Sequence, residues 1–209
     1  MRIIGGRWRG RVLQAPAGQA TRPTAERVRQ ALFDRLMHAP WAGRGWLDGA
    51  AVLDAFAGTG ALGLEALSRG AAHAVFIERD RTALAALRAN IAACAGPDPI
   101  LASVTVRIIA GDTLAPPPGQ PVALVFLDPP YGQGIVPRAM AALTRQGWAG
   151  PDTLWAIETG RDETGQGEEG QDEAGQNKTV PGPAVATFSH GAATVHIRRG
   201  LWTSDGTSG

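Results

Sequence analysis

The sequence has a single cysteine and no apolar run long enough to span a membrane. With no second cysteine, an intrachain disulfide framework is excluded, and a reducing compartment is indicated. The four histidines are scattered and lack cysteine partners, so we expect no metal. No apolar segment of a secretory signal follows Met1 and Arg2. We therefore expect a cytoplasmic protein without membrane attachment.

What the sequence does have is a length and composition typical of one large domain. The chain has 209 residues, of which 44% are hydrophobic, enough for a sizeable core. Its net charge of +1 hides two oppositely charged segments. Residues 2–29 contain seven arginines and one acid, whereas residues 162–173 contain six acids and no basic residue. Clustered arginines indicate phosphate binding, although a solvated arginine-rich edge would have the same composition.

Residues 1–40 are expected to form a basic hairpin and a helix packed on the remaining domain, residues 41–209. The first sixteen residues predict two short strands joined at Gly5 and Gly6. Thr24 is a suitable N-cap for a helix over residues 25–37, where apolar side chains recur at helical spacing. We expect this helix to bring the arginines to the edge of the sheet.

The domain itself alternates between short apolar strands and helices. Strands are expected at 51–56, 74–78, 104–109, 122–127 and 153–158, and helices at 61–70, 81–93 and 135–145. This alternation predicts an α/β fold with a doubly wound, mostly parallel sheet and right-handed crossovers. In such sheets, ligands bind at the carboxyl ends of the strands.

The tail departs from this alternation. Residues 160–182 repeat glycine, glutamine and acids with almost no apolar residues, so we expect a disordered acidic insertion. Two alternating segments, 184–190 and 193–199, then flank Gly191 and predict a closing antiparallel hairpin. The functional site is therefore expected in the sheet rather than in the insertion.

A glycine-rich turn, DAFAGTGALG, follows the first expected strand. Gly58 and Gly60 permit a tight backbone, and the amides of the next helix N-terminus can bind a ligand. With Gly63 the spacing is also that of a dinucleotide-binding turn, which NAD-dependent dehydrogenases use too, so the turn alone does not identify the ligand. Asp54, however, lies in the turn, where its charge would repel a pyrophosphate and attract a cationic or zwitterionic ligand.

Two further acids lie at strand ends. Glu78 ends the second expected strand, about twenty residues after the turn, where an acid commonly binds ribose hydroxyls. Asp112, after the third strand, is placed to accept a hydrogen bond from an adenine amino group. Together with Asp54, these acids fit S-adenosylmethionine better than NAD, although solvated acids at strand ends would give the same pattern.

The segment LVFLDPPYG joins a buried strand to an acid, two prolines and the only tyrosine of the chain. Methylation of an exocyclic base amine needs acceptors that hold the nitrogen while its lone pair turns toward the methyl group. Asp128 and the carbonyl of Pro129 are placed to do this, because Pro129 and Pro130 fix the backbone. Tyr131 offers a ring on which a flipped base can stack. The alternative is a proline-rich turn with a surface tyrosine.

Three other reactive side chains are expected to be structural. Cys94 lies in an alanine-rich helix and belongs to the core rather than to catalysis, and His190 and His196 fall in the closing hairpin.

Five collinear motifs within residues 1–158 resemble the bacterial 16S rRNA guanine-N2 methyltransferases of the RsmD type: MRIIGGRWRGR, RPTAERVRQALFDRL, DAFAGTGALGLEALSRGA, FIERD and FLDPPY. The resemblance implies a class I methyltransferase with a Rossmann-like sheet. It also implies S-adenosylmethionine as donor and a guanine of small-subunit rRNA, in an assembled ribosomal particle, as acceptor. The acidic insertion and the sequence SHG at 189–191 depart from the family pattern.

The resemblance also assigns residues to the site. The cofactor positions are matched by Asp54, Gly58, Gly60, Glu78 and Asp112. The catalytic loop is matched by Asp128, Pro129, Pro130 and Tyr131. Arg22, Thr24 and Arg27 fall in the RPT segment near the cofactor and the RNA entrance, and Arg7, Arg9 and Arg11 are expected to bind RNA.

Three alternatives remain open. The same tetrapeptide serves adenine-N6 methyltransferases of DNA, which usually carry a target-recognition domain that no segment here is long enough to supply. An NAD-dependent oxidoreductase would bind nicotinamide and not S-adenosylmethionine. A ribosome-assembly factor would keep the fold and the RNA binding without turnover, which the intact Asp128 and Tyr131 disfavour.

Overall fold

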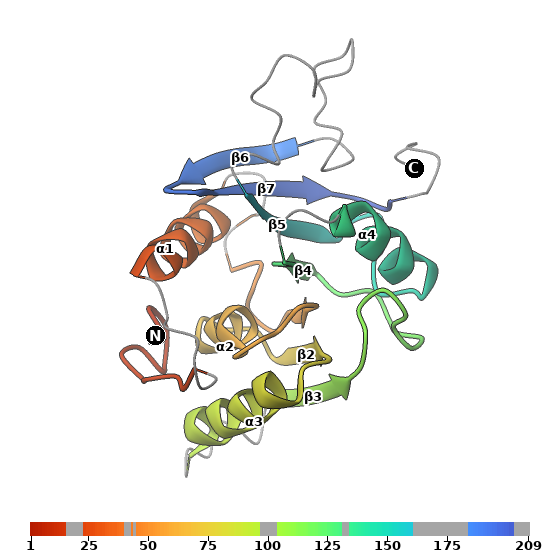
Figure 1. The fold of residues 1–209 in the computed structure, drawn as a ribbon. Helices are drawn as coiled ribbons and strands as arrows, with labels where there is room; N and C mark the ends of the chain where they lie inside the picture. Colours follow the sequence, from red (N-terminus) through yellow and green to blue (C-terminus); the bar gives the residue numbers. More distant parts are fainter. Residues whose placement is uncertain are drawn as a thin grey trace. The chain divides into compact units, whose positions relative to one another are not determined.

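The computed structural model describes residues 1–15, 23–39, 43, 45–96, 104–130, 134–160 and 184–202, with backbone only at 23–25 and 95. The chain divides into two compact units, Met1–Asp112 and Thr113–Gly209, whose elements Figure 1 shows. The division into residues 1–40 and 41–209 stays a prediction. Residues 161–182, and with them nearly all of the expected acidic insertion, lie outside the described residues.

The first unit is a parallel sheet with helices. Its elements are α1 (Pro23–His38), β1 (Ala51–Asp54), α2 (Ala61–Ser68), β2 (His73–Glu78), α3 (Arg81–Ala95) and β3 (Thr105–Ala110). The strands lie in the order β3-β2-β1, and Val75 of β2 pairs with Leu53 on one side and Arg107 on the other. Helix α2 packs on β1 and β2, which places the turn before α2 at the carboxyl end of β1.

The second unit begins parallel and ends antiparallel. Its elements are β4 (Leu124–Leu127), α4 (Ile135–Arg145), β5 (Leu154–Gly160), β6 (Ala184–His190) and β7 (Ala193–Arg199). The strands lie in the order β4-β5-β7-β6; β4 and β5 are parallel, and β7 is antiparallel to both β5 and β6. The closing hairpin expected around Gly191 is therefore confirmed.

The beginning of the chain differs in detail from the expected hairpin. Instead of two strands there is one antiparallel bridge, Arg2 opposite Val12, flanked by backbone hydrogen bonds. The backbone between them turns at Gly6 and Gly10, which have φ of 74° and 84°. It is bound both to itself, where the Gly10 amide donates to the Ile3 carbonyl, and to α2, where the Arg7 amide donates to the Ser68 carbonyl. Helix α1 starts at Pro23, a favoured first helical residue, so Thr24 lies inside the helix and is not its N-cap.

Each unit buries its own apolar side chains. Phe33, Leu53 and Phe76 are fully buried in the first unit, and Phe126 and Trp155 in the second. Each such side chain stabilises the fold by about 1.5–3 kcal/mol relative to an exposed position. The short strands β1 and β4 form because their apolar residues are buried on both faces, as parallel strands covered by helices require.

Cys94 and His196 lie in these interiors, as expected. Burial raises the pKa of the Cys94 thiol to about 11, so it is not a nucleophile near neutral pH. The ring nitrogens of His196 lie 3.3 and 3.4 Å from the hydroxyls of Thr187 and Thr159. Burial, followed by the charge of Arg198, lowers the pKa of His196 to about 4, so its ring is neutral and structural.

Candidate active site

The turn after β1 has the backbone geometry of a close-approach ligand site. Gly58 has φ of 51°, and a Cβ added there would meet nothing within 4 Å. Gly60 has φ of 79°, and a Cβ there would lie 2.4 Å from Leu87 Cδ1. Gly58 therefore leaves open space beside the backbone, whereas Gly60 lets the turn pack on α3.

Glu78 holds this turn in place from the end of β2. Its Oε2 accepts a hydrogen bond from the Gly58 amide at 2.8 Å, and its Oε1 accepts from the amides of Arg79 and Asp80 at 2.7 Å each. Three amide donors fix the carboxylate while leaving acceptor capacity for a further hydroxyl. That Glu78 binds the ribose stays a prediction. The structure shows in addition that Glu78 binds the glycine-rich turn.

Asp54 is the last residue of β1, and its side chain is buried under the glycine-rich turn instead of facing solvent. Its side chain is 2% exposed, and Oδ2 accepts from the Gly63 amide at 2.9 Å, near the start of α2. Burial raises the pKa of Asp54 to about 7, the Gly63 hydrogen bond opposes this rise, and the charge of Glu78 adds to it. Asp54 is therefore not directly exposed to a ligand, and the expected attraction of a cationic ligand stays a prediction.

Asp112 belongs to the same edge of the sheet. The Gly111 amide donates to the Glu78 carbonyl at 2.9 Å, which fixes the end of β3 beside the end of β2. The Asp112 side chain is 43% exposed, and its Oδ2 lies 3.7 Å from Nη1 of Arg79. The structure therefore gathers the predicted cofactor residues of the first unit at the carboxyl ends of its strands.

The predicted catalytic loop follows β4 in the second unit. All four residues of β4 are buried, and Asp128 is the first exposed residue after them. Pro129 is buried and Pro130 is exposed. The carboxylate is thus presented where a fully buried strand reaches the surface, whereas Tyr131 lies outside the described residues.

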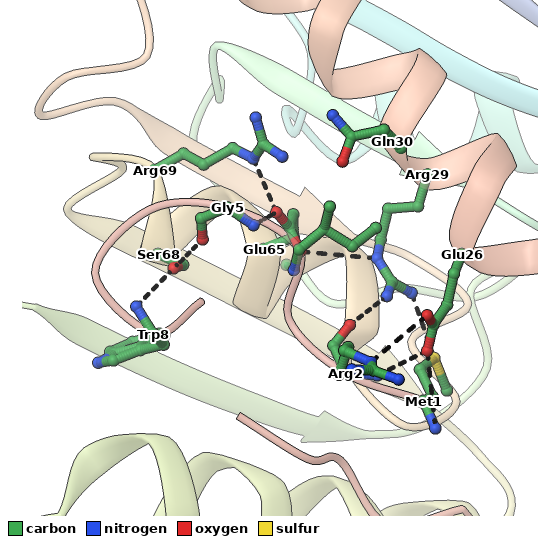
Figure 2. Close-up of polar contacts among 12 residues, drawn as sticks. Met1, Arg2, Gly5, Trp8, Glu26, Arg29, Gln30, Glu65, Ser68 and Arg69 are labelled. Carbon is green, nitrogen blue, oxygen red and sulfur yellow. Dashed lines mark hydrogen bonds and ion pairs between the residues drawn. The ribbon is translucent and has the colours of Figure 1, made fainter. Parts of the chain in front are cut away.

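The arginine-bearing turn at residues 5–10 is fixed on α2 (Figure 2). The amides of Ile4 and Gly5 donate to the two Glu65 oxygens, each at 2.8 Å. The Ser68 hydroxyl accepts from the Trp8 amide at 2.9 Å and donates to the Gly5 carbonyl at 2.6 Å. A rigid backbone therefore carries the side chains at positions 7 and 9.

Arg7 and Arg9 are exposed on this turn. Within the described part of the chain, neither guanidinium group makes an ion pair or a hydrogen bond. Arg11 differs, because its Nη1 donates to the carbonyl of Ala93 near the C-terminus of α3, where a cation is favourable. Of the three arginines expected to bind RNA, two are thus available and one also supports the fold.

The other residues predicted at the RNA entrance are described only in part. Arg27 is exposed on α1. Arg22 and the side chain of Thr24 lie outside the described residues.

Glu65, which organises this region, was not identified from the sequence. Glu65 is fully buried, and Figure 2 shows its carboxylate between Arg69 and Arg29. Its Oε1 lies 2.7 Å from Nε of Arg69, and its Oε2 lies 3.6 Å from Nε of Arg29. Burial lowers the pKa of Arg29, and the nearby Glu65 charge opposes that shift. The available signal was an acid inside the apolar helix ALGLEALS, because a buried carboxylate requires partners.

Two expected absences concern metals and membranes. Among the described residues, no group of three or more His, Cys, Asp and Glu side chains is arranged to hold a metal ion. No described helix is both long and apolar enough to cross a membrane.

Comparison with protein families and curated proteins gives consistent matches. The family model "Conserved hypothetical protein 95" matches residues 1–180. The chain is 40% identical over 160 residues to ribosomal RNA small subunit methyltransferase D of Escherichia coli K12, covering 76% of this chain and 74% of that protein. The Haemophilus influenzae protein of the same name is 35% identical over 166 residues, covering 78% and 80%.

Solved structures agree with these matches. A putative methyltransferase, yhhF, from Escherichia coli has a TM-score of 0.72 at 33% identity and covers 97% of this chain and 99% of its own. A putative methylase from Haemophilus influenzae has a TM-score of 0.67 at 28% identity, covering 96% and 98%. These likenesses and the mostly parallel α/β structure confirm the Rossmann-like class I methyltransferase fold. The chain belongs to the conserved hypothetical protein 95 family, whose curated members include the RsmD-type ribosomal RNA small subunit methyltransferases.

Proposed function

We propose that this protein transfers a methyl group from S-adenosylmethionine to the N2 amine of one guanine in small-subunit rRNA. Its relatives in Escherichia coli and Haemophilus influenzae are named as ribosomal RNA small subunit methyltransferases, which supports rRNA as the substrate. The observation that carries the donor assignment is the turn at Gly58, which is open on one side and bound to Glu78 on the other.

The residues at the carboxyl edge of the first unit fit a nucleoside with a charged side chain. Gly58 permits close approach to the backbone, and Glu78 keeps acceptor capacity for ribose hydroxyls. Asp112 is partly exposed and can accept from an adenine amino group. When bound there, S-adenosylmethionine supplies a methyl group on a cationic sulfur, which suits an edge with three acids.

The loop after β4 would hold the acceptor. Asp128 is exposed, and its carboxylate can accept hydrogen bonds from an exocyclic amine together with the carbonyl of Pro129. These acceptors orient the nitrogen lone pair toward the methyl group and stabilise the positive charge that develops as the N–C bond forms and the S–C bond breaks. The amine then loses a proton to the carboxylate or to water. Pro130 stiffens the loop, and Tyr131 would stack on the extruded base.

The N-terminal arginines would bind the RNA backbone. Arg7 and Arg9 stand exposed on a turn that α2 fixes, so their binding to phosphates costs little backbone ordering. Arg27 on α1, with Arg22 and Thr24, would line the entrance, and Arg11 would add charge while it supports α3. We place the reaction on an assembled small-subunit particle in the cytoplasm, where the base must be extruded to reach the site.

The test is methyl transfer in vitro with isotopically labelled S-adenosylmethionine. Small subunits and naked 16S rRNA from cells without the gene serve as acceptors, and nucleosides are analysed by mass spectrometry. We expect label in N2-methylguanosine, with subunits as the better acceptor. Label in N6-methyladenosine would overturn the guanine assignment. Absence of label from both acceptors would overturn the proposed activity.

A further inference from the structure

Asn90 joins two segments that are far apart in the sequence. It is fully buried on α3, and its Oδ1 accepts from the Gln14 amide at 2.7 Å. Its Nδ2 donates to the Gln14 carbonyl at 3.0 Å and to the Thr59 carbonyl at 2.9 Å. One side-chain amide therefore binds both polar groups of the Gln14 backbone and one carbonyl of the glycine-rich turn.

This arrangement uses both N–H donors of Asn90. Because the side chain is buried, each bond that is lost leaves a polar group without water to replace the partner. Thr59 lies between Gly58 and Gly60, so the position of its carbonyl depends on the conformation of the turn. A change in the backbone of the turn can therefore alter the position of Gln14 through Asn90 alone.

The N-terminal segment, residues 1–14, is also bound at other points to the helices that follow the turn. Arg11 donates to Ala93 on α3, about one helical turn beyond Asn90. Glu65 and Ser68 bind its other part to α2, which begins directly after Gly60. The segment that carries Arg7 and Arg9 is therefore hydrogen-bonded to both α2 and α3.

We propose that Asn90 is a positioning residue that couples the N-terminal segment to the glycine-rich turn, so that donor binding and RNA binding strengthen each other. The proposal rests on the proposed function. A donor that shifts the backbone of the turn at Thr59 would also shift Gln14 through Asn90, so both ligands would favour the same arrangement of the turn and the N-terminal segment. Such coupling is reciprocal, because each ligand must change the affinity of the other by the same factor.

Gln14 allows a test that leaves the core intact. Its side chain is exposed, and Gln14→Pro removes the amide hydrogen that Asn90 accepts while leaving Asn90 itself unchanged; the ring also fixes φ at this position. The matched control, Gln14→Ala, keeps both backbone groups. Isothermal titration calorimetry with S-adenosylhomocysteine should show roughly threefold weaker binding for Gln14→Pro, about tenfold weaker binding for Asn90→Ala, and no change for Gln14→Ala.

The second measurement is the affinity of 16S rRNA with and without saturating S-adenosylhomocysteine. The wild type and Gln14→Ala should bind RNA about fivefold more tightly with the ligand, and Asn90→Ala should lose this difference. Thermal melting checks that each variant is folded. If Asn90→Ala is unfolded, the comparison of Gln14→Pro with Gln14→Ala tests the coupling instead.

Equal ligand affinities of Gln14→Pro and Gln14→Ala, or an undiminished RNA effect in a folded Asn90→Ala, would overturn the coupling. If the wild type itself does not bind S-adenosylhomocysteine, the proposed function fails, and the inference fails with it.

Discussion

The carboxylate of Glu78 accepts a hydrogen bond from the amide of Gly58 at 2.8 Å, and so ties the end of β2 to the turn that follows β1. Through this contact Glu78 shapes the turn, and in the proposed function it also presents an acceptor to the donor's ribose. Both tasks concern the same edge of the sheet. A change at Glu78 should therefore act on donor binding before it acts on anything else.

Replacing Glu78 with alanine should weaken the binding of S-adenosylmethionine by tenfold or more, about 1.4 kcal/mol at least, because the turn loses its support and the ribose its acceptor. Calorimetry measures the change. Asp152→Ala, which removes an exposed acid of the second unit, is the control and should bind as the wild type does. Unchanged affinity in Glu78→Ala would remove Glu78 from the donor site.

Replacing Asp128 with alanine should abolish methyl transfer and leave donor affinity within about tenfold. Asp128 belongs to a loop of the second unit, whereas the predicted donor residues belong to the first. Rates of methyl transfer are measured at saturating concentrations of the labelled donor. A lower rate then reflects the chemical step and not weaker donor binding. Retained turnover would refute the role of the loop in holding the amine.

Arginines 7 and 9 should act through charge alone. Replacing both with alanine should lower RNA affinity and reduce the slope of log affinity against log salt by about 1.5 to 2, one unit or slightly less per lost phosphate contact. The control is Arg138→Ala with Arg145→Ala, which removes the same charge from exposed positions on α4. If both pairs change the slope equally, the N-terminal turn has no special place in RNA binding.

Asp54 should make stability depend on pH. Its pKa is about 7 in the folded chain, against an ordinary value of 3.8, so the folded chain holds the proton more tightly than the unfolded chain does. The stability that this proton provides is present below about pH 4 and is lost as the pH rises through about 7.

The variant Asp54→Asn stays neutral and keeps an acceptor for the Gly63 amide. Urea unfolding should therefore show its stability relative to the wild type to be greater at pH 8 than at pH 4.5 by about 3 kcal/mol. A stability difference that is the same at both pH values would show that Asp54 is ionised throughout or is not buried.

The elements of the fold were predictable because they depend on local patterns. The apolar run that ends at Asp128 predicted β4, and the alternating residues around Gly191 predicted the closing hairpin. The glycine-rich turn and Glu78 were found at the expected strand ends for the same reason.

What the sequence did not reveal depends on contacts between distant residues. Glu65 binds the amides of Ile4 and Gly5 across some sixty positions, and Asn90 binds Gln14 across 76. No periodicity marks such pairs, and the hydrogen bonds of a buried asparagine have no local signature. The burial of Asp54 was also missed, because Asp54 was expected in an exposed turn, whereas it is the buried last residue of β1.

The activity we propose is methylation of the N2 amine of one guanine in small-subunit rRNA. Its most direct test is mass spectrometry of 16S rRNA nucleosides from cells that lack the gene, complemented with the wild type or with Asp128→Ala. We predict that one N2-methylguanosine per rRNA is lost on deletion, restored by the wild type and not restored by Asp128→Ala. An unchanged N2-methylguanosine content in cells without the gene would contradict the account.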